Sequence, residues 1–177
     1  MKKTILAIMA CVLCFAAIIC GNEKLLANNR NVSEYITYFN EKDEARRVNI
    51  TQAAKTIDGS VVKPGEEFSF NNTVGPTTKA RGYMEGRIFI NGKDAKGYGG
   101  GVCQVSSTLH CAVVNKGLKT TERHPHSKRV KYVHEGFDAA TSYGGKDYKF
   151  VNNKNYPVII RAFVEGNKIV VRIEGKY

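Results

Sequence analysis

The stretch from Gly99 to Leu109, GGGVCQVSSTL, is the sequence feature that most constrains the fold. Three consecutive glycines have no side chains to pack, so they suit a place where the backbone turns tightly or lies open to a ligand. From Val102 apolar residues follow helical spacing, and Gly117 ends the pattern, which predicts a helix over 102–116. Cys103 then lies in the first turn, where unpaired N–H groups and the helix dipole favour a thiolate. A small buried hydrophobic cysteine would fit the same position.

Two histidines about twenty residues further on are candidate bases for that thiol. A thiol nucleophile needs a base that takes its proton and a third group that orients the base. Pro125 holds His124 out of the helical region, and on an extended strand the rings of His124 and His126 point to the same side. A cysteine helix that faces a histidine strand is the plan of papain-type sites, and we expect such an arrangement here.

Other polar residues are candidates for supporting roles. Asp138 or Asp147 would orient the imidazole, and Gln104 would donate to an oxyanion together with backbone N–H groups. The aspartates are equally suited to be turn residues, and Gln104 to be a surface residue. Contacts with substrate are expected from the glycine loop and from nearby polar side chains, namely Gly99, Gly100, Gly101, Ser106, Ser107 and Arg123.

A zinc site is a second chemical interpretation of the same residues. His124 and His126 on one strand face, with the Cys103 thiolate, would leave an open position on the metal. The sequence offers neither an obvious fourth ligand nor a Cys-x-x-Cys pair. We therefore predict no metal and no other cofactor.

The N-terminus carries a targeting pattern. Two lysines and then a largely apolar run from Thr4 to Cys20 predict a secretory signal peptide, or an uncleaved N-terminal anchor, over residues 1–21. The run is short for a membrane span. Cys20 invites a lipoprotein interpretation, but the preceding Ile18-Ile19 lacks the small residue usual beside a lipidated cysteine. We expect an extracellular or cell-surface protein, with membrane contact only through that segment.

The cysteine content bears on disulfide formation, and the net charge bears on the class of binding partner. After loss of the first 21 residues Cys103 and Cys111 would remain, and on one helix they would stand about 12 Å apart, too far for a disulfide. The formal net charge of +11, which falls to +9 without Lys2 and Lys3, favours cell-wall peptidoglycan, an anionic wall polymer or lipid head groups as partners, although solubility alone also accounts for it. Export and the lack of basic patches interleaved with aromatics argue against nucleic acid.

The order of predicted elements indicates an α+β fold with a largely antiparallel sheet and two main helices. A polar leader covers 22–34, and 35–177 is expected to form a single domain. The expected elements are a strand at 33–39, a helix at 44–58, a hairpin at 61–70, a loop at 71–81, a strand at 82–90, a tight turn at Asn91-Gly92, a connection at 93–97, the cysteine helix, an extended stretch at 119–134, and strands at 148–151, 157–164 and 168–173.

Seven motifs match one known family in order, over about residues 35–175. They are PGEEFSFN at 64–71, VGP at 74–76, RGY at 81–83, GGGVCQVSSTL at 99–109, ERHPHS at 122–127, GFDA at 136–139 and DYKFVNN at 147–153. By these motifs the chain resembles the VanW family, named for an accessory gene of some glycopeptide-resistance clusters. The resemblance implies a Gram-positive-type envelope protein connected with cell-wall biology, in a family without an established activity. At His110-Cys111 the family more often has Tyr-Asn, so Cys111 is expected to be incidental.

Two functions are therefore expected. The first is a surface thiol enzyme, a hydrolase or acyl transferase acting on peptidoglycan peptides or a related acyl substrate. In it Cys103 is the nucleophile, His126 or His124 the base and Asp138 the orienting group. The second is a non-catalytic wall-binding or accessory module in envelope maintenance or glycopeptide resistance, whose glycine loop and polar helix face form a recognition groove.

Overall fold

A computed structural model of the protein describes residues 31–90 and 93–176. The predicted signal or anchor segment at 1–21, most of the leader and the Asn91-Gly92 turn lie outside the described residues. In the described part of the chain, none of the helices has the length and apolar character needed to cross a membrane.

A four-stranded sheet with the order β1-β9-β8-β2 forms one side of the domain. Its centre is the antiparallel pair β8 (Val158–Glu165) and β9 (Lys168–Gly175), whose β-branched residues suit a pleated sheet. Alternate residues such as Ile160 and Ile173 are fully buried, so one face of the pair is core. β1 (Val32–Tyr38) and the short β2 (Val61–Val62) are the edge strands.

Two fourteen-residue helices pack on this sheet, α2 (Glu44–Ile57) against β8 and α4 (Val102–Asn115) against β9. Asp43 caps α2 by accepting the Arg46 N–H, which supplies a partner for one of the free donors of the first turn. Gly101 precedes α4 with a φ of 106°. Most of α4 is buried, including its polar residues from Gln104 to His110.

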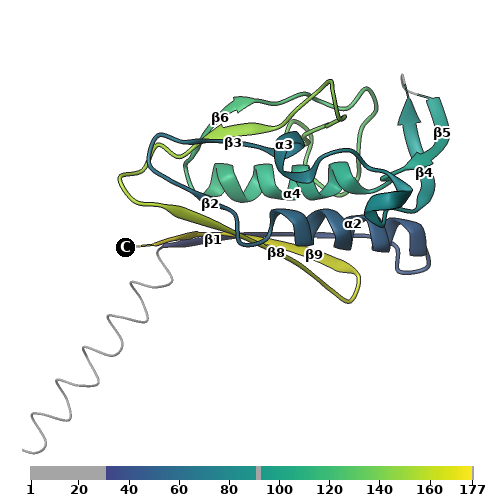
Figure 1. Cartoon of the computed structure of the whole chain (residues 1–177), viewed down its shortest axis with the longest axis horizontal. Coiled ribbons are helices and arrows are strands. Elements are labelled where there is room, and N and C mark those ends of the chain that lie inside the picture. The colour runs from purple at the N-terminus through teal and green to yellow at the C-terminus, as the bar shows by residue number, and fades with distance from the viewer. Residues whose placement is uncertain (1–30, 91–92, 177) are drawn as a thin grey trace, which may run out of the picture. The chain divides into compact units, whose positions relative to one another are not determined.

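A second, three-stranded antiparallel sheet with the order β3-β7-β6 explains this burial of α4. It consists of β3 (Glu67–Ser69), β7 (Lys149–Val151) and β6 (Lys119–Glu122), and β6 packs on α4. Figure 1 shows the two sheets on opposite sides of α4, so that helix is covered on both faces. The remaining elements are α3 (Phe70–Val74), a 3-10 turn at Lys79–Arg81, and the hairpin of β4 (Glu85–Ile90) and β5 (Lys93–Tyr98), which leads into α4.

The expected α+β class, the single domain and the two main helices are confirmed, but the hairpin predicted at 61–70 is wrong. β2 pairs with β8 and β3 pairs with β7, so the turn at Pro64-Gly65 carries the chain from one sheet to the other. Residues 70–74, expected as the end of a strand and the start of a loop, form α3. Ser69 caps that helix by accepting the Asn72 N–H.

Two other predicted segments are also corrected. The connection at 93–97 is the strand β5. The extended stretch at 119–134 is a strand only as far as Glu122, and residues 123–134 form loops. The alternation that suggested a longer strand does not follow burial, since Val133 is buried while His134 is exposed.

Candidate active site

The glycine loop is a close-packed connection that places the start of α4. Gly99 has a φ of 88°, and a Cβ there would lie 2.7 Å from the Thr77 side chain. A Cβ on Gly100 would lie 2.5 Å from the Arg87 carbonyl oxygen, and the Gly100 carbonyl accepts a hydrogen bond from the buried Asn49 amide at 3.1 Å. Side chains would therefore push the loop away from its neighbours and move the helix start.

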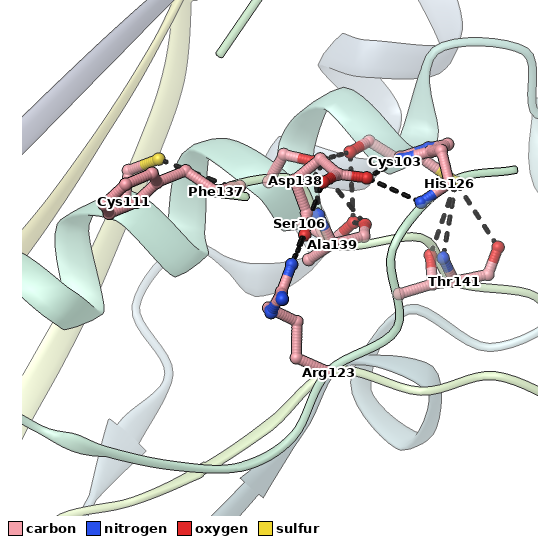
Figure 2. Close-up of polar contacts among 10 residues, drawn as sticks. Cys103, Ser106, Cys111, Arg123, His126, Phe137, Asp138, Ala139 and Thr141 are labelled. Carbon is pink, nitrogen blue, oxygen red and sulfur yellow. Dashed lines mark hydrogen bonds and ion pairs between the residues drawn. The ribbon is translucent and has the colours of Figure 1, made fainter. Parts of the chain in front are cut away.

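Cys103 is the second residue of α4 and is half-buried. Its Sγ lies 3.3 Å from the Thr141 carbonyl oxygen and accepts the Thr141 N–H at 3.5 Å (Figure 2). Burial by itself raises the pKa of the thiol. The hydrogen bond with the His126 side chain, the backbone hydrogen bond with Thr141 and the charge of His126 outweigh burial, so the pKa lies below its ordinary value.

His126 links this thiol to Asp138. Its Nδ1 lies 2.6 Å from Asp138 Oδ2, and its backbone N–H donates to the same oxygen at 2.6 Å. Since Nδ1 is engaged, Nε2 is the ring nitrogen left to face the thiol. Burial lowers the pKa of His126, but its hydrogen bonds with Cys103 and Asp138 raise it above the ordinary value overall. The pKa of Asp138 is lowered, because its hydrogen bonds with His126 outweigh burial.

Three residues expected to contact substrate instead hold the segment that carries Asp138. Arg123 donates to the Asp138 carbonyl oxygen at 2.7 Å and lies 3.8 Å from its carboxylate. Ser106 Oγ donates to the Ala139 carbonyl at 2.7 Å (Figure 2). Ser107 Oγ accepts the Ala139 N–H at 2.9 Å. Both serines are fully buried, so they fasten residues 138–141 to α4 and do not line the pocket.

The ring of His124 points to a different partner. Its Nε2 lies 2.9 Å from Glu122 Oε1, because β6 ends at Glu122 and the two histidine rings do not share a strand face. In the part of the chain that the structure describes, no group of three or more His, Cys, Asp or Glu side chains is placed to hold a metal ion. The zinc interpretation therefore has no site among these residues.

The side chains of Asp147 and Gln104 also form hydrogen bonds away from Cys103 and His126. Asp147 accepts the Ser69 hydroxyl at 2.6 Å and the Asn71 N–H at 2.8 Å, which fastens the start of α3. Gln104 lies one position beyond the cysteine, about 100° around the helix, and faces the four-stranded sheet. Its amide nitrogen donates to Thr37 Oγ1 and to the Tyr38 carbonyl, each at 2.9 Å, so these donors do not reach an oxyanion beside Cys103.

Cys103 and His126 line a pocket of about 500 Å³. The glycine loop forms part of its wall. The other walls come from α2, α3, the β4–β5 hairpin and the loops at 126–132 and 141–143. Three exposed aromatic side chains stand among the lining residues, Phe89, Tyr98 and Tyr143. The thiol therefore opens onto a cavity large enough for part of a peptide or sugar.

Two residues at the site escaped sequence reasoning. Thr141 contacts the sulfur mainly through its backbone, which leaves no side-chain signal in the sequence. Tyr132 packs edge-on against the His126 ring, with 6.5 Å between centroids, and the Arg46 guanidinium lies 5.9 Å from the Tyr132 ring centre. Burial and then the nearby Cys103 raise the pKa of the Tyr132 phenol. Its place in an apparently alternating stretch suggested only a strand residue.

Comparison with known proteins gives a family and two relatives. The sequence model of a family described as VanW like protein matches residues 45–174. The chain is 42% identical over 154 residues to a Bacillus subtilis protein named "Uncharacterized protein YoaR". This alignment covers 86% of this chain and 51% of that protein. It is 32% identical over 139 residues to "Vancomycin B-type resistance protein VanW" of Enterococcus faecalis, covering 73% of this chain and 49% of that protein.

The chain thus spans about half the length of these curated relatives. No solved structure matches the chain.

Proposed function

This chain belongs to the VanW family, and from that membership and the geometry around Cys103 we propose that it is a cysteine-dependent hydrolase or acyl transferase. Its substrates are peptidoglycan peptides or related acyl compounds. The observation that carries the proposal is the series of Cys103, His126 and Asp138 at the wall of a pocket. A thiol with a lowered pKa, a base beside it and a carboxylate that fixes the base are the parts that nucleophilic catalysis needs.

The proposed reaction begins with transfer of the Cys103 proton to His126. The thiolate attacks the substrate carbonyl carbon, a C–S bond forms, and backbone N–H groups of the first turn of α4 face the oxyanion. The imidazolium gives its proton to the leaving amine as the C–N bond breaks, which leaves a thioester. Water, or the amine of a second substrate, then attacks the thioester while His126 takes its proton. The acyl product leaves and the thiol is restored.

A place in the cell envelope is part of the same proposal. It is supported by the apolar N-terminal segment, by the formal net charge of +11 and by the family resemblance. The Enterococcus relative is named for vancomycin resistance, and this name describes that relative. A role in glycopeptide resistance is a proposal for this chain.

Digestion of purified Gram-positive peptidoglycan tests the reaction. The wild-type chain and C111S should release or join the same peptide products, identified by mass spectrometry, and C103S should form none. C111S is the matched control because it changes the same residue type on the same helix. Unchanged products with folded C103S would contradict the thiol mechanism.

The pocket also favours a second candidate function, a non-catalytic wall-binding module, because exposed aromatics line it beside the thiol. That function predicts no products from any variant. It also predicts equal sedimentation of C103S and wild type with insoluble wall. Loss of products with retained wall binding in C103S would instead favour the enzyme.

A further inference from the structure

A second groove, of about 440 Å³, adjoins the thiol pocket. It lies between the start of α2, the β4–β5 hairpin and the loop at 126–132. Its lining shares six residues with the first pocket, which are Arg46, Arg87, Phe89, His126, Val130 and Tyr132. His126 belongs to this shared wall, which places the second groove next to the proposed reacting atoms.

The charge of this groove is one-sided. Five cationic side chains line it, namely Arg46, Arg87, Lys128, Arg129 and Lys131, whereas Asp43 is the one acid among its lining residues. The Asp43 carboxylate already accepts the Arg46 N–H as the cap of α2. The groove therefore has an unbalanced positive charge that favours an anion.

Two of these cations have acidic neighbours, but the pairs are exposed. Arg87 and Asp94 are 2.7 Å apart with 68% and 55% of their side chains accessible, and Arg129 and Glu135 are 4.0 Å apart and still more exposed. Exposed ion pairs of this kind contribute roughly 0–1 kcal/mol. A carboxylate ligand can therefore take the place of such a partner at little cost.

An aromatic ring lies among the cations. Phe89 is 53% exposed, and both the Arg87 guanidinium and the Lys128 ammonium lie over its ring, 5.6 and 5.8 Å from the centre. The ring thus brings the β4–β5 hairpin and the 127–131 loop together at the groove. An apolar surface flanked by positive charge suits an organic acid with a hydrocarbon part better than a small inorganic ion.

We propose that this groove, which we call the basic groove (Arg46, Arg87, Phe89, Lys128, Arg129 and Lys131), binds the carboxylate groups of an acidic peptide whose acyl carbon lies at Cys103. The second part of the statement rests on the proposed function, while the binding itself does not. Arginine forks match planar carboxylates in a bidentate manner. The groove volume of about 440 Å³ fits a few residues of peptide better than a long polyanion.

Calorimetric titration of the full chain carrying C103A tests the binding, because this variant cannot consume a ligand. The probes are acetyl-Ala-Glu, with two carboxylates, and the neutral acetyl-Ala-Gln-amide. We expect the acid to bind at least about tenfold more tightly at low salt, with the difference shrinking as ionic strength rises. Equal affinity for both probes would overturn the proposal.

The location of the site needs a charge-matched control. K128Q/K131Q should weaken binding of acetyl-Ala-Glu about tenfold, from about threefold per exposed charge. K55Q/K63Q removes the same net charge at exposed positions that do not line the groove, and it should change the affinity less than twofold. An equal loss in both double variants would show diffuse attraction and overturn the proposal.

Poly(glycerol phosphate) is the third probe. Tighter binding of this polymer than of the acid peptide, with the same dependence on Lys128 and Lys131, would assign the groove to a phosphate polymer and overturn the peptide assignment. The proposed function is tested separately by product formation in the thiol-containing chain. Failure of the acidic site and failure of the thiol mechanism are therefore distinguishable.

Discussion

The two cysteines of α4 have pKa values shifted in opposite directions, although both lie on the same helix. Cys111 is buried and its Sγ lies 3.7 Å from the Phe137 carbonyl oxygen. Burial raises the pKa of Cys111 to about 11, despite a hydrogen bond with Tyr35 that lowers it. Cys103, which lies about two turns earlier on the helix, is also desolvated, yet its pKa is lowered.

The difference between the two thiols lies in their neighbours. Burial disfavours both thiolates, and an imidazole fixed by Asp138 reverses the balance only at Cys103. Cys103 also lies in the first turn of α4, whereas Cys111 lies within the helix, where the backbone N–H groups already have partners. Residue type and helix are shared, so the contrast comes from the His126 contact, the Thr141 hydrogen bonds and the position in the helix.

Removal of that histidine should have the largest effect. H126Q removes the hydrogen bond and the charge of His126 that lower the pKa of Cys103. That pKa therefore rises, and alkylation of Cys103 by iodoacetamide at pH 7 slows about ten- to a hundredfold. The rate is measured by peptide mapping of each cysteine with mass spectrometry, which follows Cys103 and Cys111 separately. The two thiols should then become similarly slow.

H124Q is the matched control for this substitution. His124 is bonded to Glu122, so its loss should leave Cys103 alkylation within about twofold of wild type. An equal loss of rate in H124Q and H126Q would mean that the two thiols differ for some reason other than the His126 contact.

The cysteine helix could be predicted from local sequence, but the partner of the thiol could not. Apolar periodicity and Gly117 define α4 to within one residue at its C-terminal end, and the glycines place Cys103 in its first turn. The choice between the two histidines depends on where β6 ends. The alternation of residues 129–134 predicted a strand, but these residues form loops. The burial of their side chains therefore does not follow the alternation expected of a sheet.

The sequence pattern also could not predict where the polar side chains of α4 point. Ser106, Ser107 and Gln104 point toward different layers because α4 is covered by sheets on both faces, a tertiary fact that periodicity does not contain. Of the two candidate aspartates, Asp138 reaches His126, and Asp147 holds the start of α3 through Ser69 and Asn71. Such pairings join residues far apart in sequence, and no spacing rule predicts them.

Substitution of the orienting carboxylate should have an intermediate effect. D138N removes the charge that helps to raise the pKa of His126, so the imidazolium is less favoured and the pKa of Cys103 rises in turn. In wild type the thiolate is present above the lowered pKa and is lost as pH falls through it, so the midpoint of the alkylation profile lies below the ordinary value of 9.0. D138N should shift that midpoint upward and slow alkylation at pH 7 about three- to tenfold.

D147N tests whether this shift is specific. Asp147 supports α3 through Ser69 and Asn71, so its substitution should lower the melting temperature while leaving the alkylation midpoint in place. A midpoint that moves equally in D147N and D138N would show that the thiol responds to general loosening of the fold.

The smallest effect on reactivity should come from the other cysteine. C111A removes a buried sulfur that packs beside Phe137, which should destabilise the fold by about 1–2 kcal/mol in chemical denaturation. Because Cys111 has no contact with His126 or Asp138 among the hydrogen bonds of the described residues, alkylation of Cys103 should keep its rate and its midpoint. A slowed Cys103 in C111A would mean that the two ends of α4 are coupled through its packing. The histidine alone would then not account for the contrast between the thiols.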